Sequence, residues 1–305
     1  MTAAAQIRPA GVFTPRLLVY FAIITFIWGS TWLVIKTQLG VVPASWAVAY
    51  RFLLGGSAMM LMVLVRGKSL RIGGAGHRFA LVNAVMQFVL NFNLVYRAEE
   101  HVTSGLVALS FALLIVPNAL LSAAFLGQRI TPRFALGSIM GIGGVALIFA
   151  RDLMAPGLDT RAVALGLALA IGGVLSASVA NVMQATSTGR SLPAEGGLAW
   201  SMAYGGLLNA GLAWALAGPP VIDTSPAFLL GLAYLGLVAS AVAFSLYYAI
   251  IRAVGPGKAA YNGVVVPLVA MALSTVFEGY RWTPLAVAGG ALAMVGLVVA
   301  LRSRS

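Results

Sequence analysis

The sequence predicts an all-α membrane protein of ten transmembrane helices, arranged as two inverted five-helix repeats around a central cavity. Its composition, its long apolar runs and a repeated motif indicate this fold class. Of 305 residues, 61% are hydrophobic and only 9% are charged, whereas about 25% are charged in a soluble domain. A soluble fold of this size could not cover its surface with so few charges, so the chain is expected to lie within a bilayer.

Ten segments are long and apolar enough to span a membrane as helices, which takes about 20 residues each. Connections rich in Gly and Pro, such as Pro156-Gly157 and Pro219-Pro220, separate them and are all short. No connection is long enough to be an extramembrane domain. The predicted spans, in order, are 17–35, 46–65, 79–96, 102–126, 134–150, 162–187, 196–217, 227–251, 259–277 and 285–301.

The basic residues predict the topology. With the N-terminus in the cytoplasm, 13 of the 19 Lys and Arg residues fall on the inner side, which is the bias expected of cytoplasmic connections. The six assigned to the outer side include Lys36 and Arg51. An even number of spans then places both termini in the cytoplasm. The net charge of +12 comes from these connections and forms no basic face, so no nucleic-acid partner is expected.

A repeated motif divides the chain. Residues 125–137 (FLGQRITPRFALG) and 277–289 (FEGYRWTPLAVAG) share six of 13 positions at an offset of 152. Each copy joins the fourth span of a half to the fifth, so the halves are residues 1–151 and 152–305. Because five is odd, the second half enters the membrane from the opposite side, as in many secondary transporters that bind substrate near the midplane. The alternative is convergence on a short turn motif.

Two prolines occupy nearly equivalent places in the two halves. Pro117 lies near the middle of the fourth span and Pro267 near the middle of the ninth. Proline removes one backbone hydrogen bond and usually kinks a helix, so both are predicted hinges. Static kinks that neighbouring helices tolerate are the alternative.

Uncharged polar residues within the spans predict the substrate site. Asn83, Gln87 and Asn91 recur every four residues and share one helix face. Hydrogen bonding between helices is the alternative, especially for Ser and Thr. A cavity of amides, hydroxyls and aromatic rings suits a zwitterion with an apolar side chain. The predicted substrate-binding residues are Trp28, Ser30, Asn83, Gln87, Asn91, Ser178, Asn181, Gln184, Tyr248, Tyr261 and Asn262.

Other functions are disfavoured because the spans lack the residues that those functions require. No carboxylate lies near the centre of a span, which weakens proton antiport and favours facilitated transport. With no cysteine, two histidines and no phosphate-binding glycine loop, neither a metal site, a cofactor nor an enzyme is expected. Small residues on the fifth and tenth spans, such as Gly137, Gly141 and Gly296, permit close helix contact within a monomer or across a homodimer.

Several segments together resemble the drug/metabolite transporter superfamily, EamA type. These are FIWGSTWLVIK at 26–36, AYRFLLGG at 49–56, and the stretch from Ser104 to Gly127 with the turn after it. Within that superfamily the chain is most similar to bacterial amino-acid exporters of the YddG type. The resemblance implies a ten-helix bundle in the inner membrane that exports substrate by alternating access. Gly127-Gln128 departs from the Gly-Glu that the family often has there.

The function predicted from the sequence is therefore export of aromatic and other neutral amino acids and related metabolites, by facilitated diffusion or uniport. Proton-coupled efflux of drugs or lipophilic cations is an alternative, and it calls for a carboxylate within the membrane. A membrane scaffold that transports nothing is an alternative of another class, but it has no need of an inverted repeat with paired prolines.

Overall fold

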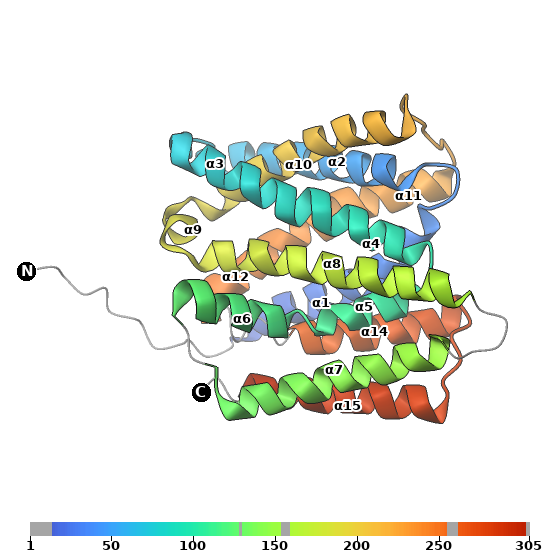
Figure 1. Ribbon diagram of the computed structural model, residues 1–305. Coiled ribbons are helices and arrows are strands. Elements are labelled where there is room, and N and C mark those ends of the chain that lie inside the picture. Colours follow the sequence, from blue (N-terminus) through green and yellow to red (C-terminus); the bar gives the residue numbers. More distant parts are fainter. Residues whose placement is uncertain (1–13, 128–129, 154–158, 255–261, 303–305) are drawn as a thin grey trace, which may run out of the picture.

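A computed structural model describes residues 14–127, 130–153, 159–254 and 262–302 (Figure 1). Within these ranges the chain is helical and contains no strand. The helices form one bundle in which segments far apart in the sequence lie side by side (Figure 1). The all-helical prediction is therefore confirmed.

The first half contains seven α-helices and one π-helix. They are α1 (Pro15–Thr37), α2 (Ala44–Val65), α3 (Gly73–Asn83), the π-helix η1 (Ala84–Leu90), α4 (Asn91–Glu99), α5 (Ser104–Ala112), α6 (Ile115–Leu126) and, closing the half, α7 (Pro132–Leu153). The second half comprises α8 (Thr160–Ala185), α9 (Ser187–Ser191), α10 (Ala194–Ala217), α11 (Pro226–Ala233), the π-helix η2 (Tyr234–Val242), α12 (Ala243–Val254), α14 (Asn262–Phe277) and α15 (Pro284–Arg302).

A helix, or a run of consecutive helices, lies over each of the predicted spans. In the described ranges, six are long and apolar enough to cross a membrane: Pro15–Thr37, Ala44–Val65, Gly73–Glu99, Ser104–Leu126, Thr160–Ala185 and Pro226–Tyr247. Two further apolar stretches, Val265–Phe277 and Pro284–Gly296, are shorter. The chain is thus a multi-pass membrane protein, while the count of ten crossings stays a prediction.

Local sequence sets the helix ends. Thr14 caps α1, where its hydroxyl accepts a hydrogen bond from the Leu17 amide at 3.3 Å, and Pro15 follows at the first helical position. Ser225 and Pro226 repeat this arrangement at α11. Such caps satisfy amides that have no partner inside the helix. Gly127 ends α6 with φ of 66°, in the left-handed region that glycine adopts without strain.

Two antiparallel helix pairs, α2 with α10 and α7 with α15, pack closely because glycines lie at their contacts. A Cβ placed on Gly206 of α10 would lie 2.7 Å from the Leu53 amide nitrogen of α2, and one on Gly56 would lie 2.8 Å from the Ala203 nitrogen. A Cβ on Gly144 of α7 would likewise meet the backbone of α15. Close approach of this kind is how small residues let membrane helices pack. The glycines of the fifth and tenth predicted spans therefore face one another inside one chain.

The bundle has two distinct ends. Helix α1 begins and α15 ends at the left of Figure 1, which we call the terminal end, and we call the opposite end the distal end. Near the distal end every residue of α5 from Ser104 to Ser110 is buried. In α6, which runs toward the terminal end, only Ala119 and Ser122 are buried. Within the predicted span 102–126, the half nearer the distal end is therefore the more deeply buried.

The two π-helices occupy corresponding places in the two halves. Adding the repeat offset of 152 to η1 gives 236–242, which lies within η2. Wide turns of this kind are rare and are frequent at functional sites.

Candidate functional site

An aromatic cluster surrounds Trp28 of α1. Its ring packs edge-on against Phe244 at 5.3 Å between centroids and against Tyr247 at 4.9 Å. The indole Nε1 donates to the Ala239 carbonyl oxygen of η2 at 3.3 Å. Phe88 of η1 lies 6.0 Å from Phe244 and extends the cluster toward the first half. Both π-helices thus contribute to one apolar region.

Other predicted residues near this cluster are engaged in contacts between helices. The Ser30 hydroxyl lies 2.7 Å from the Tyr234 hydroxyl of η2. Asn262, buried on α14, donates to the Thr25 hydroxyl of α1 at 2.7 Å. The hydrogen bonds between Ser30 and Tyr234 and between Thr25 and Asn262 join the first half of the chain to the second.

The predicted amide face packs against α8. Asn83 is buried, and its Oδ1 accepts a hydrogen bond from Gln184 Nε2 at 3.1 Å. Asn91 is also buried and lies against Gly173, where a Cβ would come 3.3 Å from Asn91 Oδ1. Gln87, between them in sequence, is half-buried on η1. Asn83 and Gln184 are therefore hydrogen-bonded to one another. This contact agrees with the alternative stated above, in which such residues join helices and do not bind substrate.

The remaining predicted residues are spread out. Ser178 is fully buried, and its hydroxyl has no hydrogen-bond partner among the described residues. Asn181, on the same helix α8, is exposed. Tyr248 belongs to α12, but its side chain lies outside the described part of the structure, as does the whole of Tyr261. The structure therefore does not gather all eleven residues into one group.

The two predicted hinge prolines have different surroundings. Pro117 follows a break between α5 and α6, where the amide of Val116 bonds the Leu113 carbonyl at 2.9 Å, three residues back. Proline has no amide hydrogen to continue the α-helical pattern, which accounts for the break. Pro267 is buried inside α14, which continues past it. The single predicted span 102–126 thus consists of two helices.

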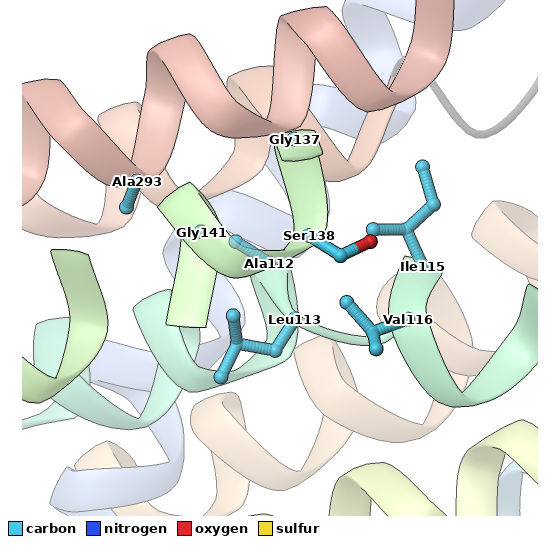
Figure 2. Close-up of a pocket in the computed structure, with 8 residues that line it drawn as sticks. All are labelled: Ala112, Leu113, Ile115, Val116, Gly137, Ser138, Gly141 and Ala293. Carbon is cyan, nitrogen blue, oxygen red and sulfur yellow. The ribbon is translucent and has the colours of Figure 1, made fainter. Parts of the chain in front are cut away.

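A small cavity lies beside this break. Figure 2 shows Ala112, Leu113, Ile115 and Val116 around the break facing Gly137, Ser138 and Gly141 of α7, with Ala293 of α15 at the upper left. Its volume is about 10 Å³, which is room for about one water molecule. The missing side chains of the two glycines leave this space next to the break.

A larger groove lies elsewhere. It has a volume of about 570 Å³ and runs between α14 and α15, with Leu109 of α5 at one side. Pro267 is the one predicted site residue in its lining; the other walls include Met271, Thr275, Trp282 and Met294. The groove is mostly apolar and does not include the aromatic cluster around Trp28.

Sequence reasoning missed Arg51, which it counted among the outer charges. The structure places Arg51 inside α2, seven residues after the helix begins at Ala44, with 2% of its surface exposed. Its Nε donates to the Ser240 hydroxyl of η2 at 3.2 Å. An arginine within an apolar run is itself a functional signal, and that signal was available in the sequence.

A second buried charge lies at the distal end. Glu99, the last residue of α4, has no exposed surface. The Lys36 ammonium donates to the backbone carbonyls of Glu99 and Val102, and so ties α1 to the end of α4. Glu278 accepts hydrogen bonds from the amide and the hydroxyl of Ser104 and so joins the end of α14 to the start of α5. Both carboxylates lie at helix ends, so they do not contradict the expectation that no carboxylate lies near the centre of a span, but Glu99 is buried inside the bundle all the same.

Long apolar helices with aromatic, amide and ionisable side chains buried between them define a multi-pass membrane protein built around polar interior contacts. Comparison with known proteins identifies its family. Residues 16–150 and 164–302 match the profile of the EamA-like transporter family. The chain belongs to this family, which is one of transporters that move small molecules across membranes, and its resemblance to the drug/metabolite transporters is confirmed.

Three relatives and one structure illustrate the similarity. Protein PagO of Salmonella typhimurium is 24% identical over 86% of this chain and 85% of its own. The uncharacterised transporter YvbV of Bacillus subtilis is 23% identical over 95% of this chain and 92% of its own. A "Probable terminal-alkyne amino-acid exporter" of Streptantibioticus cattleyicolor is 31% identical over 66% of this chain and 65% of its own. One solved crystal structure has a TM-score of 0.69 at 20% identity, covering 96% of this chain and 100% of that one, which shows the fold.

Proposed function

We propose that the protein exports neutral amino acids, aromatic ones included, and related metabolites across the bacterial inner membrane by alternating access. In this proposal ten spans form two inverted repeats, both termini are cytoplasmic, and the substrate moves down its own gradient. The observation that carries the proposal is the cluster of Trp28, Phe88, Phe244 and Tyr247, which both π-helices border.

The pairing of helices supports the inverted repeat. In the predicted order of spans, α2 and α10 are the second of each half, and α7 and α15 are the fifth. Each helix packs antiparallel on its counterpart through glycines, as an axis in the membrane plane requires. The corresponding positions of η1 and η2 agree with the same axis.

The chemistry of the cluster supports the substrate class. Aromatic rings favour apolar and aromatic side chains, since edge-on and offset contacts add about 0.5–1.5 kcal/mol per pair to the area buried. Gln87 of η1 is half-buried near Phe88 in sequence and offers an amide to a zwitterion. One relative is named as an exporter of a terminal-alkyne amino acid, and that name adds weight to the same class.

The test is release of labelled phenylalanine or methionine from proteoliposomes, with and without a proton gradient. Saturable release that needs no gradient supports facilitated export. Gln87→Leu should abolish this release without reducing expression, while Thr188→Ala, at an exposed position of α9, should leave it unchanged. Absence of release across a panel of neutral amino acids would rule the proposal out.

Proton-coupled efflux of lipophilic cations is the second candidate, and the complete burial of Glu99 favours it. A carboxylate inside the protein is what such a pump uses to hold a cation or a proton. Uptake of tetraphenylphosphonium into acid-loaded proteoliposomes, lost in Glu99→Gln, would favour this candidate. Saturable release of amino acids that needs no proton gradient would exclude it.

A further inference from the structure

Arg51 is held deep in the bundle by apolar and polar neighbours. Its guanidinium carbon lies 4.5 Å from the centre of the Phe92 ring and 5.4 Å from that of Phe52. Its Nε is hydrogen-bonded to Ser240, and Tyr96 lies beside it. Two aromatic rings and one hydroxyl thus fix the orientation of the planar group.

The charge of Arg51 is not neutralised by contact with a carboxylate. Within the described residues, no carboxylate oxygen comes within 4.0 Å of its nitrogens. Its Nη1 is buried and has no hydrogen-bond partner there. An unpaired guanidinium buried at this depth is costly, and such residues commonly face the interior of a bundle and mark substrate pathways.

Glu99 does not serve as the missing partner in this conformation. Both of its carboxyl oxygens are themselves without a hydrogen-bond partner among the described residues. The cation that contacts Glu99 is Lys36, whose ammonium donates to the Glu99 backbone carbonyl. In this conformation the guanidinium is therefore left without a carboxylate partner among the described residues.

The Arg51 guanidinium lies next to the aromatic cluster. Phe52 lies 4.9 Å from Phe88, which is the ring that extends the Trp28 cluster into the first half. Ser240, which binds Arg51, follows Ala239, whose carbonyl oxygen binds the Trp28 indole. The cation and the aromatic rings are thus held by neighbouring residues of the same π-helix.

We propose that Arg51 binds the carboxylate of the substrate, so that this transporter recognises compounds with a free carboxylate next to an apolar or aromatic group. The fork of the guanidinium can donate two parallel hydrogen bonds to a carboxylate, which gives both affinity and orientation. The apolar part of the substrate then lies against Phe88 and Phe244. For amino acids as the particular substrates, the inference rests on the function proposed above.

The first experiment uses the unmodified protein in detergent and measures thermal stabilisation by each of four probes. L-Phenylalanine and 3-phenylpropionate keep the carboxylate, while L-phenylalanine methyl ester and phenethylamine lack it. We expect the two carboxylates to bind at least about tenfold more tightly than the other two, which is about 1.4 kcal/mol. Equal binding of all four, or no binding of either carboxylate, would overturn the inference.

The second experiment uses variants. Arg51→Gln should weaken binding of the carboxylates by about 30-fold or more, which is the lower end for removing one partner of a buried charged hydrogen bond. It should leave binding of the ester and the amine within about twofold. Arg51→Lys keeps the charge but not the fork, so it should recover part of the loss. Arg97→Gln, at an exposed position of the neighbouring helix α4, is the matched control.

The outcomes separate this inference from the proposed function. If 3-phenylpropionate binds through Arg51 but no amino acid binds, carboxylate recognition holds and amino-acid export fails. If amino acids bind and their esters bind equally well, export can hold and the role of Arg51 fails. If Arg51→Gln does not fold, the four-probe comparison on the unmodified protein still decides the matter.

Discussion

Close packing of α2 on α10 makes Gly206→Ala a sharp test of the fold. A Cβ on Gly206 would lie 2.7 Å from the Leu53 nitrogen and 2.9 Å from the Phe52 carbonyl carbon. Ordinary contacts of a Cβ begin near 3.4 Å, so the methyl group is too close by about 0.7 Å. The atoms it meets are backbone atoms of α2, which cannot turn aside as a side chain can. The two helices must therefore separate.

Gly211→Ala is the matched control for this change. Gly211 lies on the same helix, and a Cβ there would have no atom within 4 Å. Both variants gain the same preference of alanine over glycine for a helix, about 0.5–1 kcal/mol, and this gain cancels when they are compared. The remaining difference is the overpacking, which typically costs about 1–3 kcal/mol.

Unfolding by titration with SDS in mixed micelles measures this difference. We expect Gly206→Ala to unfold at a lower SDS fraction than Gly211→Ala, by about 1–3 kcal/mol in free energy. Because α2 also carries Arg51 and Phe52, Gly206→Ala should slow transport as well. Equal stability of the two variants would refute the close contact between α2 and α10.

Three further changes test other contacts. Asn209→Leu removes two hydrogen bonds, the one that Asn209 donates to the Phe88 carbonyl at 2.8 Å and the one that it accepts from Asn93 at 2.7 Å. In the same titration it should lower the free energy of unfolding by about 1–3 kcal/mol. The loss should be smaller when Asn93→Leu is also present, because Asn93 is then not left unpaired. Lys36→Met should lower the free energy of unfolding by a similar amount, and by less when Glu99→Gln is also present. Additive effects of the two substitutions would show that Lys36 and Glu99 do not stabilise one another. Gly141→Ala, whose Cβ would lie 3.7 Å from Leu113, should slow transport in proteoliposomes with little loss of stability.

The positions of the helices were largely predictable because long apolar runs carry a strong signal. Every predicted span has helix over it, from α1 at Pro15–Thr37 to α15 at Pro284–Arg302. The wide turns of η1 and η2 and the short α9 were not predicted, since no single residue type marks them in the sequence. The break before Pro117 was predictable as a kink but not as two separate helices.

The site was less predictable, because the spacing of residues along one helix does not show which residues of another helix they contact. The spacing of Asn83, Gln87 and Asn91 indicated a shared face but not that Gln184 of α8 would bind Asn83. Arg51 was misjudged for a different reason: its closeness to the start of a span made it look like a charge of the connection. Its burial depends on Phe92 and Ser240, which come from distant parts of the chain.

In the alternating access proposed above, we expect the contacts at the distal end and the break between α5 and α6 to be the parts that move. Opening the distal end requires α5 to part from α14, and the hydrogen bonds of Glu278 to Ser104 oppose that separation. Because α5 and α6 are separate helices, α5 can tilt without carrying α6 with it. Gly137 and Gly141 line the small cavity beside the break. In the alternating access proposed above, the contacts of Glu278 with Ser104 would close the distal end, and the break before Pro117 would be the place where α5 tilts.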